Sequence, residues 1–125
     1  MDRERFEELV AVGLKRIPAR FLEKLKNVAI MVEDEPTAEQ LLSVGIRKDG
    51  GDTLLGLYEG VSNLEGGHTH RIFPDRITIF RFPILEQAGR DEEISIIVAD
   101  TIRHEIAHHF GMSEDEVARA ERGRR

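Results

Sequence analysis

A stretch late in the chain, residues 94–110, limits the fold most, because its apolar side chains are spaced for a helix that has no wholly polar side. A helix that is apolar all round is normally buried in the core of its domain. The same stretch nevertheless carries five polar side chains that are costly to bury without partners: Asp100, His104, Glu105, His108 and His109. A metal ion would resolve much of this conflict, so the stretch predicts a buried metal-binding helix.

The spacing of two of these histidines supports a metal site. Residues four apart on a helix lie one turn from each other on nearly the same face, so His104 and His108 can bind one metal ion. Glu105 follows the first histidine and can reach a water bound to that metal. Mostly apolar surroundings should raise the pKa of its carboxyl, which favours a general base near neutral pH. The pattern predicts Zn²⁺ bound by His104 and His108, with Glu105 as the catalytic residue.

A catalytic zinc site has three protein ligands, so one further ligand is expected. Gly111 turns the chain after the helix, and Glu114 occupies the third-ligand place of the extended pattern H-E-x-x-H-x-x-G-x-x-(H/D). Asp115, one residue further on, is the fallback ligand. In the alternative interpretation Glu114 serves only the start of a final helix, where a carboxylate interacts favourably with the helix dipole.

Other polar residues near the motif have weaker interpretations. Asp100 either accepts a hydrogen bond from a ligand imidazole or is an ordinary polar residue of the helix. His109 is expected to be a core histidine, hydrogen-bonded to a carbonyl or carboxylate. His68 and His70 lie in a glycine-flanked loop, where solvent-exposed histidines are commoner than a second metal site or a cleft lining. Tyr58 is a candidate oxyanion stabiliser without further support.

Composition restricts the class of protein. The 125 residues suffice for one hydrophobic core, so a single domain spanning residues 1–125 is expected. The absence of cysteine excludes disulfides and leaves His, Asp and Glu as metal ligands. A net charge of −6 argues against nucleic-acid binding, which depends on an excess of lysine and arginine. The charged N-terminal segment is no signal peptide and no window is long enough for a membrane span, so a cytoplasmic location is expected.

The order of predicted elements indicates an α+β fold. Helices are predicted over 2–16 and 18–25, over 91–110, and from Ser113 to about residue 122. A further short helix is predicted with Pro36 near its first turn and with Leu41 and Leu42 on one face. Strands are predicted at 28–32, 54–58 and 76–82, the first one buried and the last one stopped by Pro83. Gly111 is expected to end the long helix in a left-handed conformation. The expected architecture is a small mixed sheet with a buried helix and a short C-terminal helix.

The segment His104–Gly111 resembles the bacterial minimal zincin-like metallopeptidases, a family of short single-domain proteins. The resemblance extends over most of the chain and includes Leu54–Gly60 and Pro74–Phe80. It implies a zincin-like α+β fold, a zinc ion and peptidase activity. The family usually has aspartate where this chain has Glu114, and Asp115 follows, so the third ligand stays open between these two residues.

Three functions are consistent with these features. The main hypothesis is a zinc metalloendopeptidase whose peptide or protein substrate adds as a β-strand to the segment 76–82. A metal-dependent single-strand endoribonuclease would have a similar ligand spacing, but Glu105 and the acidic net charge argue against it. The third hypothesis is a non-catalytic binding module stabilised by metal. No nucleic acid or membrane is expected as a partner, and the sequence predicts neither the specific substrate nor the oligomeric state.

Overall fold

The computed structural model describes residues 1–47, 51, 53–60 and 74–111. Its helices and strands are, in chain order, α1 (Arg3–Leu14), α2 (Ala19–Leu22), the short 3-10 helix η1 (Glu23–Leu25), β1 (Val28–Glu33), α3 (Ala38–Ser43), β2 (Gly56–Glu59), β3 (Asp75–Phe80), α5 (Arg81–Gln87) and α6 (Asp91–His109). The strands form a mixed sheet in the order β1-β3-β2, in which β1 is parallel and β2 antiparallel to β3. The predicted α+β fold with a small mixed sheet is confirmed.

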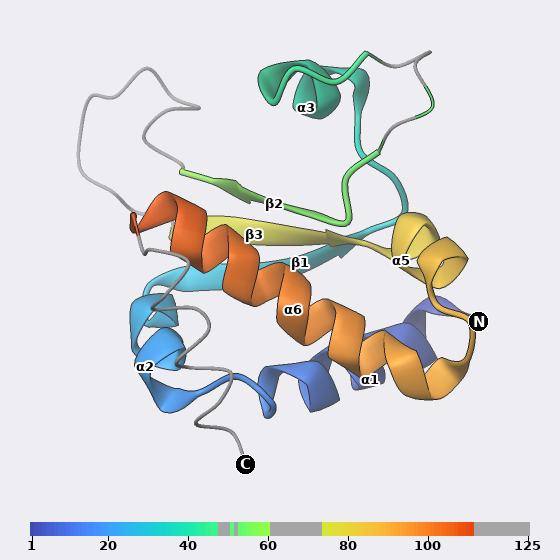
Figure 1. Ribbon diagram of the computed structural model, residues 1–125, viewed down its shortest axis with the longest axis horizontal. Coiled ribbons are helices and arrows are strands. Elements are labelled where there is room, and N and C mark those ends of the chain that lie inside the picture. The colour runs from blue at the N-terminus through green and yellow to red at the C-terminus, as the bar shows by residue number, and fades with distance from the viewer. Residues whose placement is uncertain (48–50, 52, 61–73, 112–125) are drawn as a thin grey trace.

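The long helix α6 lies across one face of the sheet (Figure 1). Helices α1 and α2 lie on the side of β1, and α3 lies on the side of β2. Side chains alternate between the two faces of a strand, and Val32, Ile77 and Ile79 belong to the same buried cluster as Ile102 of α6 and Phe6 of α1. The main core is therefore enclosed between α6, α1 and one face of the sheet.

Local sequence signals explain where several helices begin and end. The side chain of Asp2 accepts a hydrogen bond from the backbone N–H of Arg5 and so caps α1. Thr37 and Gln40 form a reciprocal capping box at the start of α3, which was not predicted from the sequence. Gly111, directly after α6, has a φ of 67°, as predicted for the residue that turns the chain there.

Three predicted features are corrected. Pro83 does not stop the third strand, which ends at Phe80, because Pro83 lies in the first turn of α5, where a missing N–H leaves no helical hydrogen bond unmade. The first strand, β1, is an edge strand and not a buried one, so Met31 is 43% exposed although Val32 is buried. Only one of the two leucines on α3 is buried, since Leu42 is 64% exposed.

Two further predictions fall outside the described residues: the final helix from Ser113 to residue 122, and the loop that carries His68 and His70. Within the described part of the chain, no helix combines the length and the apolar character needed to cross a membrane.

Candidate metal centre

His104 is held in an orientation that suits a metal ligand. Its Nδ1 lies 2.8 Å from the backbone oxygen of Asp100, one helical turn earlier. A carbonyl can only accept, so Nδ1 carries a proton and donates, and Nε2 is the nitrogen that would bind a metal. The main chain of Asp100 is thus the partner of the His104 ring, whereas its carboxylate pairs with Arg103.

His108 lies one turn beyond His104, and both side chains are exposed on α6. Both imidazoles act electrostatically on the carboxyl of Glu105, with His108 having the larger influence. The three residues of the motif are therefore gathered at the last two turns of the helix, and the two rings are accessible from solvent.

Glu105 lies half-buried between α6 and the sheet. Burial raises the pKa of its carboxyl above the usual 4.5, while the Tyr58 N–H, His108 and His104 act to lower it by smaller amounts. Oε1 of Glu105 accepts a hydrogen bond from the backbone N–H of Tyr58 at 2.8 Å. The direction of this pKa shift agrees with the prediction, and it moves the carboxyl toward the range in which a general base works near neutral pH.

Burial of polar groups on α6 differs from the expectation. All three histidines of the helix are exposed, so they are not costly core groups. The fully buried ionisable residue is Arg103, which is 1% exposed and makes an ion pair with the Asp100 carboxylate. The helix buries one broad side, which includes Ile102 and Ile106, and is not buried all round. The apolar spacing alone could not show which side is buried, because it counts Ile96 with the buried isoleucines although Ile96 is exposed.

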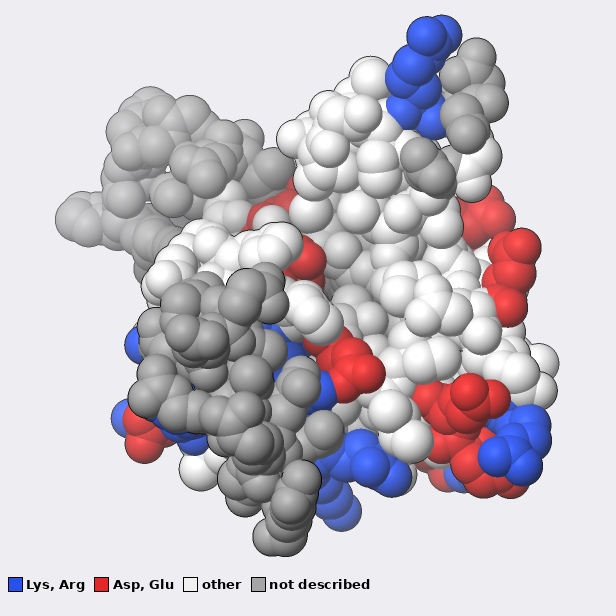
Figure 2. Space-filling model, viewed as in Figure 1, with Lys and Arg blue, Asp and Glu red and all other residues white. Residues whose placement is uncertain are grey.

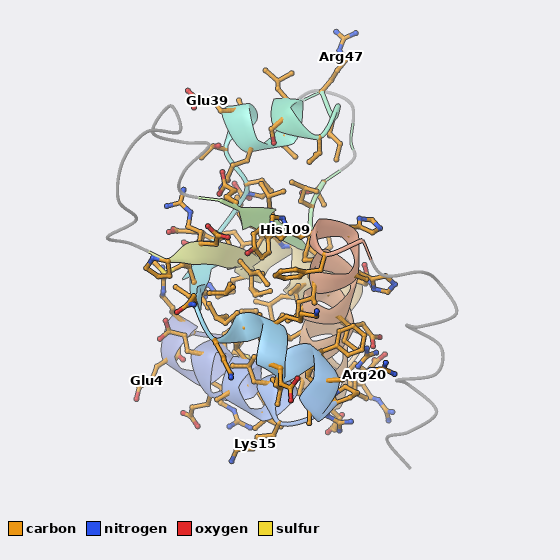
Figure 3. All side chains as sticks on the ribbon, turned by 90° about the vertical axis from the view of Figure 1, so that its left-hand side faces the viewer. Glu4, Lys15, Arg20, Glu39, Arg47 and His109 are labelled. Atoms are coloured by element: carbon orange, nitrogen blue, oxygen red, sulfur yellow. The ribbon has the colours of Figure 1, made fainter. Side chains whose placement is uncertain are left out.

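His109 was predicted to be a hydrogen-bonded core residue, and this is wrong. It is exposed at the end of α6, beside the sheet (Figure 3). Its ring stacks on Tyr58, with the ring centroids 3.7 Å apart and the planes 16° from parallel. The ring of Phe110 meets both in edge-to-face contacts. His109 therefore belongs to an aromatic cluster with Tyr58 and Phe110, apart from the pair His104 and His108.

A cavity of about 1000 Å³ lies next to this aromatic cluster. Its lining comes from η1, the start of β1, Tyr58, Asp75, His109 and Phe110. Among its described lining residues are neither His104 nor His108, so the histidine pair does not line this cavity. Tyr58 connects the cavity to the motif, because it lines the cavity while its N–H donates to Glu105.

A family model for zincin-like metallopeptidases matches residues 25–124. The chain belongs to this family. Among solved structures it is similar to a "Conserved hypothetical protein" from Thermo thermophilus, with a TM-score of 0.54 and 24% identity over 88% of this chain and 94% of that one. At that identity the likeness concerns the fold alone. No curated protein matches the chain.

The donor set of this zincin-like chain fits part of a zinc site. Two imidazoles one turn apart, one of them oriented by a carbonyl, suit zinc, which prefers nitrogen donors from histidine. No group of three His, Asp or Glu side chains converges among the residues that the structure describes. The predicted third ligands, Glu114 and Asp115, lie outside those residues.

The strand order of this zincin-like domain corrects the expectation about where a substrate strand would add. The segment 76–82 was expected to receive an added strand, but β3 is central and pairs with β1 on one side and β2 on the other. Its main-chain groups are therefore already engaged in the sheet. The strand next to α6 and Glu105 is β2, whose Tyr58 N–H points away from β3.

The hydrogen bond from Tyr58 to Glu105 was not predicted from the sequence, where Tyr58 was considered only as an oxyanion stabiliser. Its hydroxyl instead donates to Oδ2 of Asp75 at 2.7 Å. Every residue except proline has a main-chain N–H, so the sequence does not mark which of these groups will bond a distant side chain. The usable signal was Gly56 within an apolar strand, since a glycine there often marks a close approach of another element.

Proposed function

We propose that this protein is a zinc-dependent peptidase in which His104 and His108 bind the metal and Glu105 is the general base. The observation that supports it most is the bond from His104 Nδ1 to the Asp100 carbonyl, because it prepares Nε2 for a metal. The raised pKa of the neighbouring Glu105 carboxyl adds to this support. Glu114 or Asp115 is proposed to complete the ligand set.

The chemistry follows from the positions of these groups. When bound, zinc supplies a Lewis acid that polarises the scissile carbonyl and lowers the pKa of a coordinated water. Glu105 takes the proton from the attacking water and gives it to the leaving amine. The Tyr58 N–H holds one oxygen of this carboxylate, so the carboxylate cannot swing freely. His104 keeps its tautomer through the Asp100 carbonyl.

A mostly uncharged area lies between α3 and the first half of α6, with acidic and basic side chains around its margins (Figure 2). This area lies away from the last two turns of α6, which carry His104, Glu105 and His108. An RNA-binding surface would need clustered lysine and arginine to attract phosphates. The endoribonuclease hypothesis therefore gains no support from this face, and we propose a peptide or protein as the substrate.

The experiment compares Glu105→Gln with a matched control, Glu92→Gln. Glu92 lies at the other end of α6 and its side chain is 78% exposed, so its loss should leave activity unchanged. Glu105→Gln should retain zinc but lose about 10²–10⁴-fold in kcat on an unbiased peptide library, the usual contribution of a general base. Equal cleavage by wild type and Glu105→Gln would overturn the mechanism.

Metal analysis of the three neighbouring histidines tests the ligand set. His104→Ala and His108→Ala should each lose bound zinc, whereas His109→Ala should keep it, because His109 stacks on Tyr58. Zinc loss in His109→Ala with retention in either of the others would contradict the assignment. Zinc binding by the wild type without turnover of any peptide would instead favour the non-catalytic module, and metal-dependent cleavage of single-stranded RNA would favour the endoribonuclease.

A further inference from the structure

Tyr58, in β2, contacts both α6 and β3 at the point where the general base is held. Leu55 accepts a hydrogen bond from Phe80 across the sheet, and residues of an antiparallel strand alternate in direction, so Tyr58 directs its N–H away from β3. That N–H bonds Oε1 of Glu105 at 2.8 Å. The main chain of β2 thus reaches α6 through this residue.

The side chain of Tyr58 is fixed from two sides. Its hydroxyl donates to Oδ2 of Asp75, the first residue of β3, at 2.7 Å. Its ring stacks on His109, the last residue of α6, at 3.7 Å. These two anchors connect the end of β2 to the neighbouring strand and to the final turn of the catalytic helix.

We propose that Tyr58 is a positioning residue for Glu105. Asp75 and His109 hold its side chain, and the anchored strand then keeps the Tyr58 N–H on one carboxylate oxygen of Glu105. The inference depends on the proposed function, because positioning matters for rate only if Glu105 is the general base. Misplacing a catalytic group by about 1 Å can cost about a hundredfold in rate, so the anchors should affect kcat more than substrate binding.

Paired substitutions separate anchoring from simple stability. Asp75→Ala removes the acceptor for the Tyr58 hydroxyl, whereas Asp75→Asn retains a side-chain oxygen there. His109→Ala removes the stacked ring, whereas His109→Phe retains an aromatic ring in its place. Residue 58 is unchanged in all four variants, so its own amide signal can be followed by NMR. A role limited to global stability would speed the exchange of all core amides together, whereas anchoring acts locally on the Tyr58 amide.

The first measurement is hydrogen exchange of the Tyr58 amide in zinc-free protein. We expect exchange to be about tenfold faster in Asp75→Ala, His109→Ala and their double variant, because the bond to a charged acceptor is weakened. Asp75→Asn and His109→Phe should restore slow exchange, and Glu105→Ala should give the fastest exchange. Unchanged exchange in the two single alanine variants would overturn the proposal, even if the double variant does not fold.

The second measurement is the kinetics of the zinc-loaded enzyme on a cleaved peptide. Each alanine variant should lose about 10–100-fold in kcat with KM and zinc content unchanged, and the matching conservative variant should recover most of this loss. A loss confined to KM, or no loss, would overturn the proposal. If the wild type cleaves no peptide, the proposed function fails, and the amide exchange still decides whether Tyr58 holds Glu105.

Discussion

Opposing influences act on the carboxyl of Glu105, and they decide how it responds to pH. Burial raises its pKa and dominates, whereas the Tyr58 N–H and the two imidazoles lower it. A metal ion near His104 and His108 would add a further positive charge and favour the ionised form. The zinc-free protein therefore holds a carboxyl that binds its proton more tightly than an exposed glutamate does.

This raised pKa predicts a pH-dependent stability difference between wild type and Glu105→Gln in zinc-free protein. The folded state binds the proton of Glu105 more tightly than the unfolded state does. Protonation of Glu105 therefore stabilises the fold fully at pH values below about 4.5, the usual pKa of this carboxyl. This stabilisation is lost as the pH rises through the raised pKa. The thermal midpoint of wild type should therefore fall relative to that of Glu105→Gln over this range and then stay level.

Thermal melts between about pH 4 and pH 8 in the presence of a chelator would measure this difference. Glu92→Gln serves as the control, since it removes one exposed carboxylate from the other end of the same helix. A wild type that gains stability relative to Glu105→Gln on raising the pH would mean that the Tyr58 N–H and the imidazoles outweigh burial, contrary to the half-buried position of this carboxyl.

At the scale of elements, Gly56 sets the distance between β2 and α6. A Cβ at this position would lie 2.6 Å from Cγ2 of Thr101 on α6 and 3.2 Å from the backbone oxygen of Thr78 on β3. Both distances are shorter than an ordinary van der Waals contact. Only a residue without a side chain lets β2 approach α6 this closely, and the Tyr58 N–H reaches Glu105 because of that approach.

Gly56→Ala should therefore reduce both stability and activity. The added methyl group forces β2 away from α6, at a cost of about 1–3 kcal/mol in the free energy of unfolding, and it should lower kcat by displacing the Tyr58 N–H. Denaturant unfolding and peptide kinetics measure the two effects.

Thr101→Ser provides the matched test, because it removes Cγ2 but keeps a hydroxyl that can bond the Ile97 carbonyl, as Thr101 does at 2.8 Å. The double variant should regain part of both losses, since the Thr78 oxygen still limits the space. Strictly additive effects of the two substitutions would show that the contact with Thr101 does not set this distance.

These contacts show which parts of the fold the sequence could predict. Apolar spacing located α1, α6 and the three strands, because periodicity is a local property of the chain. The strand order was not predictable in this way, so β3 was expected at an edge although it is central. The partners of Tyr58, which are Glu105 on α6 and Asp75 on β3, are brought together by packing, and no local pattern records this.

The same distinction holds for the candidate site. The motif predicted the residue types and the helical spacing, and the pKa of the Glu105 carboxyl is raised as expected. Exposure was not predicted correctly, since the histidines lie on the open side of α6 while Arg103 is buried. A hydrophobic pattern assigns sides to a helix but does not say which side the rest of the chain will cover.

For the molecule as a whole, α6 serves both the core and the site. Its buried side runs from Ile94 to Ala107, and only its last two turns also carry the candidate site. Its first half packs against α1, where Val98 and Ile94 are buried in the main core. Its last two turns carry His104, His108 and Glu105. Substitutions where α1 packs on the first half of α6 should therefore change stability and leave the proposed metal binding unchanged.

Gly13→Ala tests this separation. Gly13 lies in α1, and a Cβ there would be 2.8 Å from the backbone oxygen of Ser95 and 3.1 Å from Cγ1 of Val98. Alanine favours an exposed helix position over glycine by about 1 kcal/mol, but here it must push α1 from α6 against a backbone atom that cannot rotate away. We expect a net loss of about 1–3 kcal/mol in the free energy of unfolding.

Urea unfolding of Gly13→Ala, with Ala11→Gly as control, distinguishes the effect of helix propensity from that of the contact between α1 and α6. Ala11 is exposed on the same helix, so its replacement should cost only about 1 kcal/mol from helix propensity. Zinc content and kcat should be unchanged in both variants, because His104 and Glu105 lie beyond the region that α1 contacts through Gly13. A Gly13→Ala protein that is more stable than wild type would show that the two helices are not held at this distance. A stable variant that loses zinc would show that the packing of α1 reaches the metal-binding turns, and the two ends of α6 would then have to be treated as one unit.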